Sequence, residues 1–394
     1  MPDAVATRLP RVLLVGRTRY ELPFAGADAR KFAALDEVMN WHLLARARRS
    51  QTDDRVTLLR RTPLDGILFH VRLPFTIARA ARRRRPHVIV AQDPILGAAA
   101  LVARRLARSD AAVVVEVHGD WRTATRLYGS RQRRLLARPS DAVACEALRR
   151  ADAVRTISGF TAALVHDVGG TVDSQFPTFL DLEPFSRTPI RPLPRDPIAL
   201  FVGALERYKN VDGLLLAWPE VCSRVPGARL RIVGNGRLAS QVLRAVRTDR
   251  SIEYTPRLNR EQLAATLDAA TCLVLPSRSE GLGRVVVEAL TRGRPVVATS
   301  VGALREVVVD GQTGLLVDIR DPRSLEEALV SVLGDPELAA RLGANAAPAA
   351  LALAVTPSEW AHSLEQLVET AQRKRNGALT NLNARRTWLS HFPR

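Results

Sequence analysis

The segment from Pro276 to Ser300, PSRSEGLGRVVVEALTRGRPVVATS, constrains the fold of this chain more than any other. A loop that carries Glu280 and two glycines is followed by a short apolar stretch, Arg284 to Arg292, with helical spacing. Gly293 fits the C-cap of that helix, and Pro295 begins an apolar run with the composition of a buried strand. The segment therefore predicts a loop, a helix and a strand in succession.

The start of this predicted helix has the chemistry of an anion site. Backbone N–H groups there have no intrahelical partner, and the helix dipole adds positive potential, so phosphate is the expected ligand. Gly281 and Gly283 allow a close approach of the backbone. Glu280 and Glu288 repel phosphate, but their carboxylates accept hydrogen bonds from hydroxyl groups. An anion cradle between two carboxylates is what a nucleoside-diphosphate sugar requires.

The ordered pattern PSxxEGxGxxxxEAxxxGxPVVA resembles the retaining glycosyltransferases of family 4, and it is far more specific than a lone glycine-rich loop. In that family the first Glu contacts the transferred sugar and the second contacts the nucleotide ribose. The resemblance implies these roles for Glu280 and Glu288. It also implies donor contacts by the residues between them, namely Gly281, Leu282, Gly283, Arg284 and Val285. The alternative is that Glu280 is a solvated loop acid and that Glu288 only pairs with Arg284 or Arg292.

Length and composition place broad limits on the chain. Its 394 residues exceed what one hydrophobic core usually supports, so two domains are expected. The three cysteines, Cys145, Cys222 and Cys272, are scattered without a CxxC pair, which indicates a reducing compartment. The N-terminal apolar run is too short for a signal peptide, and no run approaches the length of about 18 residues that a membrane helix needs. These features predict a cytoplasmic protein.

The net charge of +18 is concentrated in the N-terminal half. Residues 1–190 hold 31 Lys and Arg against 19 Asp and Glu, whereas residues 191–372 hold 21 of each. Arginine clusters at 46–49, 82–85 and 131–134 fit anionic lipid headgroups, which predicts a peripheral position on the inner face of the cell membrane. The alternative is that these arginines are solvated helix faces. Aromatic residues make up only 5%, without a stacking array, which argues against nucleic acid as a partner.

Strand and helix patterns alternate through residues 1–185, the predicted N-terminal, acceptor-side domain. Buried strands are predicted over 11–16, 54–60, 87–91, 112–117 and 152–157, and helices over 31–48, 75–84 and 95–107. Alternation of this kind predicts a parallel, doubly wound sheet of Rossmann type. In such a sheet, ligands bind beyond the carboxyl ends of the strands.

Polar residues follow several of these strands. His118 emerges from the strand 112–117 beside a glycine, and the matching His in family 4 lies near the donor sugar, which implies a catalytic role. Weaker acceptor-side candidates are Arg17, Arg19, Asp93, Asp120 and Trp121. The alternatives are a His satisfied by local carbonyls, solvated loop arginines and, as the preferred interpretation of Asp93, a helix cap. The glycine-rich loop that family 4 members often carry after the first strand is absent here.

The proline-rich segment 176–197, called the linker segment below, leads out of this domain, and its residues 186–197 are predicted to link it to a nucleotide-sugar-binding domain over 198–356. A strand ends at Gly203, and Lys209 matches a family Lys that grips the donor diphosphate, whose charge grows as the glycosidic bond breaks. Ala204 replaces the Arg that the family pairs with this Lys, and Arg207 is the candidate substitute. The alternative for Lys209 is a plain surface charge.

Two further strand ends in this domain are expected at the donor. Gly234 and Gly236 follow a strand and precede a helix, which favours close approach to a nucleotide. Arg257 and Leu258 stand where the family binds the base. Residues 357–373 form an amphipathic helix that, by the resemblance, crosses back to the N-terminal domain. The basic tail 374–394 is expected to be mostly disordered, or an arm that contacts a membrane or partner.

The sequence thus predicts the GT-B fold, with two Rossmann-like domains that face a cleft. The resemblance implies retaining transfer of a sugar from a UDP- or GDP-sugar to an acceptor hydroxyl, such as that of a membrane lipid or an envelope polysaccharide precursor. No metal or cofactor is expected, because no Asp-x-Asp site is found and Asp181-x-Glu183 lies in the linker segment. The alternatives are a nucleotide-sugar epimerase of the same fold, which needs no acceptor, and a non-catalytic relative.

Overall fold

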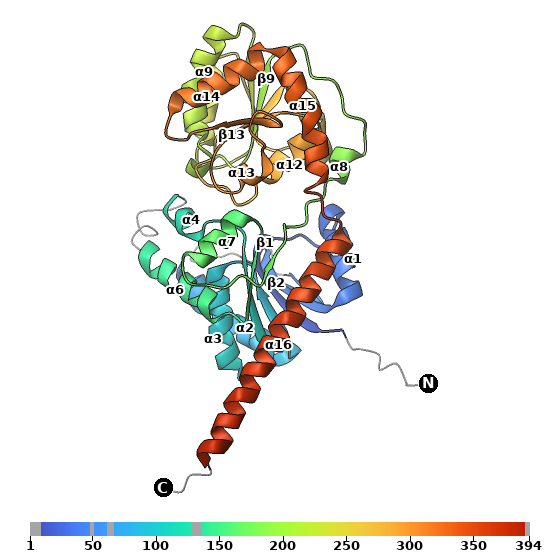
Figure 1. The fold of residues 1–394 in the computed structure, drawn as a ribbon, viewed down its shortest axis with the longest axis vertical. Coiled ribbons are helices and arrows are strands. Elements are labelled where there is room, and N and C mark those ends of the chain that lie inside the picture. The colour runs from blue at the N-terminus through green and yellow to red at the C-terminus, as the bar shows by residue number, and fades with distance from the viewer. Residues whose placement is uncertain (1–8, 48–50, 61–66, 128–135, 391–394) are drawn as a thin grey trace.

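The computed structural model describes residues 9–47, 51–60, 67–127 and 136–390, which fold into two α/β units, each built on its own sheet. Figure 1 shows the two units stacked, with the last long helix lying along the N-terminal one. The central strands of both sheets are mostly apolar and buried, as expected when helices cover both faces of a parallel sheet, whereas the short strands Gln51–Thr52 and Ser174–Gln175 are polar and are not buried. The predicted pair of doubly wound parallel-sheet domains is confirmed.

Within the described residues, the first sheet has eight strands in the order β3-β4-β2-β1-β5-β6-β7-β8. Neighbouring strands run parallel, except that β3 is antiparallel to β4. The strands are β1 (Arg11–Arg19), β2 (Asn40–Ala47), β3 (Gln51–Thr52), β4 (Val56–Arg60), β5 (Val88–Ala91), β6 (Ala112–Val117), β7 (Ala153–Thr156) and β8 (Ser174–Gln175).

Two hydrophobic cores cover the faces of this sheet. One core includes residues of α2, α3, α4, α6 and α7, and the other includes residues of α1 and of the C-terminal helix α16. The helices of the first unit are α1 (Gly26–Val38), α2 (Ile67–Arg84), α3 (Pro94–Ala107), α4 (Trp121–Leu127), α6 (Ala137–Arg150) and α7 (Gly159–His166). A short helix, α8 (Glu183–Ser186), lies in the segment that leads to the second unit.

The second sheet has six parallel strands in the order β11-β10-β9-β12-β13-β14. They are β9 (Ile198–Val202), β10 (Arg229–Val233), β11 (Ile252–Thr255), β12 (Cys272–Leu275), β13 (Val296–Thr299) and β14 (Gly314–Val317). The helices are the 3-10 turn η1 (Arg207–Lys209), α9 (Val211–Arg224), α10 (Ala239–Thr248), α11 (Arg260–Asp268), α12 (Arg284–Thr291), α13 (Leu304–Val307), α14 (Pro322–Gly334) and α15 (Pro336–Leu351).

Within each sheet the strand order reverses at one point, and the loops that meet at this point of the second sheet form the candidate site. In the second sheet it lies between β9 and β12, so the loops that follow these two strands, 203–210 and 276–283, meet at one edge. The loop after β6 of the first sheet contacts the loop after β12, through Gly119 and Gly281. The carboxyl edges of the two sheets therefore face each other.

One predicted helix is wrong. The sequence predicted a helix over 31–48, whereas α1 ends at Val38 and the central strand β2 follows. Trp41 and its neighbours up to Ala45 are buried, because β2 lies between β1 and β4 and pairs with both. A short apolar run does not distinguish a buried strand from a helix by its period alone. Helix α2 also begins at Ile67, earlier than predicted.

The C-terminal helix is longer than predicted. α16 (Pro357–Ser390) packs against α1 and the first sheet, and it continues through most of the tail that we expected to be disordered. Lys374 forms an ion pair with Asp173, and Arg375 donates a hydrogen bond to the carbonyl oxygen of Asp110. These contacts hold the helix beyond residue 373, and Figure 1 shows its last turns extending past the first unit. Among the described residues, no helix is long and apolar enough to span a membrane.

We expect Trp360→Ala to destabilise the N-terminal domain, because Trp360 is 4% exposed and belongs to the core between α1, α16 and the first sheet. Removal of a buried aromatic side chain costs about 3–5 kcal/mol of unfolding free energy. Urea unfolding followed by tryptophan fluorescence measures this loss. The exposed Glu369→Ala on the same helix is the control, and an equal loss in both variants would contradict the packing role.

Candidate active site

An ion pair joins the two loops at the edge of the second sheet. Lys209, at the end of η1, donates to a carboxylate oxygen of Glu280 in the loop after β12. Both side chains are largely buried, at 11% and 15% exposure. Ser277 adds a longer hydrogen bond of 3.4 Å from its Oγ to the same carboxylate. The pair places one cation and one acid side by side at the contact between the domains.

The backbone at Glu280 is held by a second loop. The amide of Ala303 donates to the carbonyl oxygen of Glu280 at 3.2 Å, and the Thr299 hydroxyl donates to the carbonyl of Ser277. Gly302 adopts a positive φ of +57°, and a Cβ there would lie 2.1 Å from the Glu280 carbonyl oxygen. A glycine is therefore required at 302 for the Glu280 loop to take this path.

Helix α12 begins with free donors, as the sequence predicted. Gly283 is its N-cap in the left-handed region, with φ 73°, and no side chain caps the helix. In the described part of the chain, the amides of Gly283, Arg284 and Val285 donate to no group. Together with the helix dipole, three free amides make this end of α12 suited to an anion.

Glu288, one turn further along α12, is a buried carboxylate that faces an arginine of another helix. It is 7% exposed, and burial raises its pKa above the ordinary value of a Glu, against the attraction of Arg284 and Arg260. Nη2 of Arg260 lies 3.7 Å from its Oε1. A pairing of Glu288 with Arg292 is wrong, because the Arg292 guanidinium is bound to Asp268.

His118 follows β6, as predicted, and both of its ring nitrogens have partners. Nε2 lies 3.2 Å from Glu116 Oε2, and Nδ1 lies 3.3 Å from the hydroxyl of Thr178 in the linker segment. Burial disfavours the Glu116 anion, but the adjacent Arg155 guanidinium and His118 hold the pKa of this carboxyl below its usual range. These contacts orient the ring toward its own domain and leave the carbonyl of His118 facing Gly281.

The two domains meet through backbone. A Cβ on Gly281 would lie 2.1 Å from the carbonyl oxygen of His118, so only a glycine permits this contact. The Ser158 hydroxyl donates to the Gly281 carbonyl at 3.2 Å. The amides of Gly159 and Phe160, at the start of α7, donate to the two carboxylate oxygens of Glu306 at 2.8 and 2.6 Å. These contacts hold the domains in a closed arrangement.

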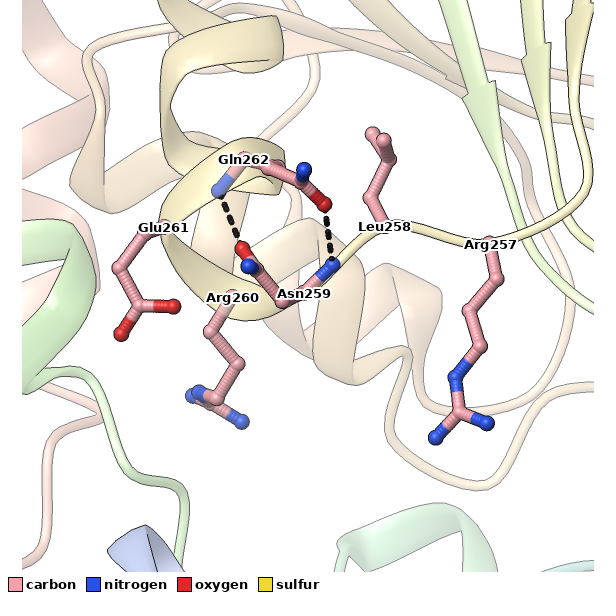
Figure 2. A pocket seen from close by; sticks show the side chains of 6 residues that line it. All are labelled: Arg257, Leu258, Asn259, Arg260, Glu261 and Gln262. Atoms are coloured by element: carbon pink, nitrogen blue, oxygen red, sulfur yellow. Dashed lines mark hydrogen bonds between the residues drawn. The ribbon is translucent and has the colours of Figure 1, made fainter.

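A hollow of about 560 Å³ opens where α11 begins, lined by residues 257–262. Figure 2 shows Arg257 and Arg260 extending from this turn, and Asn259 and Gln262 joined by two hydrogen bonds. This capping box fixes the first turn of α11 and with it the origin of the Arg260 side chain. Arg257 is exposed, whereas Leu258 packs partly against the core of the second domain.

Comparison with known protein families identifies the family to which the chain belongs. Residues 12–175 match the model of the "Glycosyl transferase 4-like domain", and residues 185–348 match that of "Glycosyl transferases group 1". The chain belongs to the group 1 glycosyltransferases of the family 4 type. The resemblance stated from the sequence is confirmed.

Curated glycosyltransferases are similar over part of the chain. A D-inositol 3-phosphate glycosyltransferase of Nocardioides sp. is 35% identical over 202 residues, which are 46% of this chain and 43% of that protein. A glycogen synthase of Mycobacterium tuberculosis is 37% identical over 145 residues, which are 36% of this chain and 35% of that protein. The match thus spans less than half the length of these relatives.

Solved structures show the same GT-B fold over nearly the whole chain. Sucrose-phosphate synthase from Thermosynechococcus elongatus superposes with a TM-score of 0.69 at 20% identity, covering 95% of this chain and 99% of that one. HepE of Anabaena in complex with UDP-glucose superposes with a TM-score of 0.66 at 16% identity, covering 94% and 100%. The predicted GT-B architecture is confirmed.

Two predicted donor residues of this chain are glycines that its own backbone requires. A Cβ on Gly234 would lie 1.8 Å from the carbonyl oxygen of Gly203, and one on Gly236 would lie 2.4 Å from that of Leu205. These glycines therefore allow two neighbouring loops of the chain to approach each other closely. Arg207 is exposed in η1 and makes no ion pair within the described residues, so it is available to a ligand. Leu282 and Val285 pack partly against the core of the second domain.

Most acceptor-side candidates have structural partners. Asp93 caps α3 by accepting from the Leu96 amide and pairs with Arg17 at 3.0 Å, so the cap interpretation is confirmed. Asp120 accepts from the amides at the start of α4. Trp121 is 9% exposed and belongs to the core of the first unit, so little of its side chain faces solvent. The Arg19 side chain lies outside the described residues.

The sequence interpretation missed the partners that orient the predicted residues. They are Glu116, Arg155, Ser158, Thr178, Asp181, Arg260 and Glu306. Two of them carry a signal: Glu116 and Arg155 are charged residues inside apolar strands, where a charge is buried only when it is paired. The others stand in loops and helix starts, and their partners are distant in sequence.

We expect Glu306→Gln to loosen the contact between the domains, because the neutral amide accepts more weakly than the carboxylate at the start of α7. Hydrogen exchange at the amides of Gly159 and Phe160 is expected to rise by about tenfold. Exchange mass spectrometry on peptides around residue 160 measures this. Glu326→Gln in the second domain is the matched control, and unchanged protection in Glu306→Gln would contradict a role in closure.

Proposed function

We propose that this chain is a retaining glycosyltransferase that transfers a sugar from a UDP- or GDP-sugar to an acceptor hydroxyl without a metal ion. The observation that carries this proposal is the Lys209–Glu280 pair beside the free amides of α12, at the contact between the domains. The pair supplies a cation for a leaving diphosphate and a carboxylate for sugar hydroxyls within one site. Lys209, Arg207 and the helix amides take the place of a metal's charge.

We assign each part of the donor to a position in this arrangement. The diphosphate is placed at the amides of α12, where it displaces Glu280 from Lys209, because a doubly charged group attracts the ammonium more strongly than a single carboxylate. Glu280 is then free to accept from sugar hydroxyls next to Gly281. Glu288 accepts from the ribose, and the hollow at Arg257 and Leu258 holds the base.

The proposed reaction balances without an added base. The acceptor hydroxyl oxygen forms a bond to the anomeric carbon on the face from which the diphosphate leaves, and the bond between that carbon and the phosphate oxygen breaks. The acceptor proton passes to an oxygen of the departing diphosphate. Contacts such as those of Gly281 and Glu306 close the domains and exclude water, which limits hydrolysis of the donor.

The comparisons support a sugar nucleotide as the donor. One similar structure holds UDP-glucose, and another, from E. coli, holds UDP-2-fluoro glucose. The similar curated proteins include D-inositol 3-phosphate glycosyltransferases of Nocardioides sp., Nocardia farcinica and Streptomyces scabiei. A polyhydroxylated acceptor, such as a lipid headgroup or a polysaccharide precursor, fits the proposal.

A screen of UDP- and GDP-sugars by thermal shift tests the proposed donor, since bound ligand stabilises the folded state. With the donor that it identifies, Lys209→Ala is expected to lower kcat by about 10²–10³ because a cation that stabilises the transition state is lost. Radiolabelled sugar transfer measures kcat, with Arg341→Ala, an exposed residue on α15, as the control. If no sugar nucleotide stabilises the protein, or if Lys209→Ala retains full kcat, the proposal is wrong.

We also propose a cytoplasmic enzyme whose N-terminal domain binds the inner face of the cell membrane. Helix α2 exposes two apolar side chains, Val71 at 57% and Phe75 at 63%, at a spacing that places them on one face. Arg72 and Arg79 are exposed on the same helix. Apolar side chains flanked by arginines suit insertion among anionic headgroups.

We expect the protein to co-sediment with phosphatidylglycerol-containing vesicles and to dissociate as salt is raised, since screening weakens the arginine contacts. Phe75→Ser is expected to reduce the bound fraction several-fold by removing buried apolar area. Leu216→Ser, at an exposed position of the second domain, serves as the control. Equal binding to neutral vesicles, or no effect of Phe75→Ser, would reject this surface.

A further inference from the structure

Glu288 has its two nearest opposite charges on different helices. Arg284 stands one turn before it on α12, and Arg260 reaches it from the first turn of α11. The carboxylate of Asp181, in the linker segment, faces it with a like charge. A carboxylate that is 7% exposed loses most of its hydration, so its charge depends on these neighbours.

Arg260 contacts both carboxylates. Its Nη2 lies 3.7 Å from Glu288 Oε1, its guanidinium donates to the Asp181 carbonyl, and its Nε lies 3.8 Å from the Asp181 carboxylate. The Phe185 ring lies 5.2 Å from its Cζ and covers one side. The capping box of α11 fixes the backbone from which Arg260 extends, as Figure 2 shows. The side chain is therefore held from three directions while it borders the hollow.

Asp181 connects this arginine to the N-terminal domain. Its carboxylate is 4% exposed and lies 2.5 Å from Nη2 of Arg30 on α1. The charges alternate from α1 through the linker to α12, in the order Arg30, Asp181, Arg260 and Glu288. These ion pairs thus connect Glu288, the predicted ribose-binding residue of the second domain, to the first domain through the linker segment.

We propose that Arg260 is a positioning residue of the donor site: it provides the positive charge that keeps the Glu288 carboxylate ionised and oriented, and Asp181 holds Arg260 in place. This rests on the proposed function, in which Glu288 accepts hydrogen bonds from the ribose hydroxyls. Arg260 acts through Glu288 and needs no contact with the nucleotide. No other arginine of a neighbouring helix forms an ion pair with Glu288 in the described part of the chain.

Calorimetric titration with UDP and GDP, which are probes present in either proposed donor class, tests this inference between about pH 6 and pH 9. Arg260→Gln is expected to weaken binding by about tenfold near the lower end. The loss is expected to shrink as pH rises, because burial without the arginine raises the Glu288 pKa further and the carboxyl regains its charge only at higher pH. Arg260→Lys is expected to restore most of the affinity.

A double variant separates positioning from a direct contact. If Arg260 acts through Glu288, Arg260→Gln adds no loss to Glu288→Gln, whereas independent contacts give additive losses. Arg244→Gln, an exposed residue on α10, is the control for charge alone. Additive losses, a pH-independent loss or failure of Arg260→Lys to rescue would overturn the inference. If neither nucleotide binds the wild type, or if Glu288→Gln binds normally, the donor site itself is misplaced, which is a different failure.

Discussion

The contact between Gly281 and the carbonyl of His118 is the constraint on which the two-domain arrangement depends. No side chain fits at this contact, so the backbone of the loop after β12 packs directly against the backbone at the end of β6. Glu280 precedes this contact and Lys209 reaches it through an ion pair, which brings both to the boundary of the first domain. The same close packing brings together the groups of the neighbouring hydrogen bonds, in which the Ser158 hydroxyl donates to the Gly281 carbonyl and the amides at the start of α7 donate to Glu306.

Features carried by a continuous segment could be predicted from the sequence. The loop, helix and strand of 276–300 depend on glycines, a free helix start and an apolar run, all of them local signals. Lys209 meets Glu280 because the strand order reverses between β9 and β12, and a doubly wound sheet places such loops together. The pairings of Arg260 with Glu288 and of Arg155 with Glu116 could not be assigned, since neither partner's position specifies the other.

The predictions from the sequence failed where one local pattern is compatible with two different structures. An acid after a strand is the signature both of a ligand contact and of a helix cap, and Asp93 and Asp120 are caps. Glycines after a strand admit either a nucleotide or another loop, and Gly234 admits the backbone of Gly203. The apolar run around Trp41 fits a helix and a strand equally, and the decision came from pairing with β1 and β4.

Helix α16 has a consequence for how this protein is made. Its buried residues, among them Trp360, Leu364 and Leu367, complete a core whose buried members outside this helix all lie before residue 180. During synthesis, this apolar face of the first sheet stays uncovered until the whole second domain has emerged from the ribosome. The first domain therefore cannot finish folding ahead of the second, and nascent chains are exposed to aggregation or to chaperones for that interval.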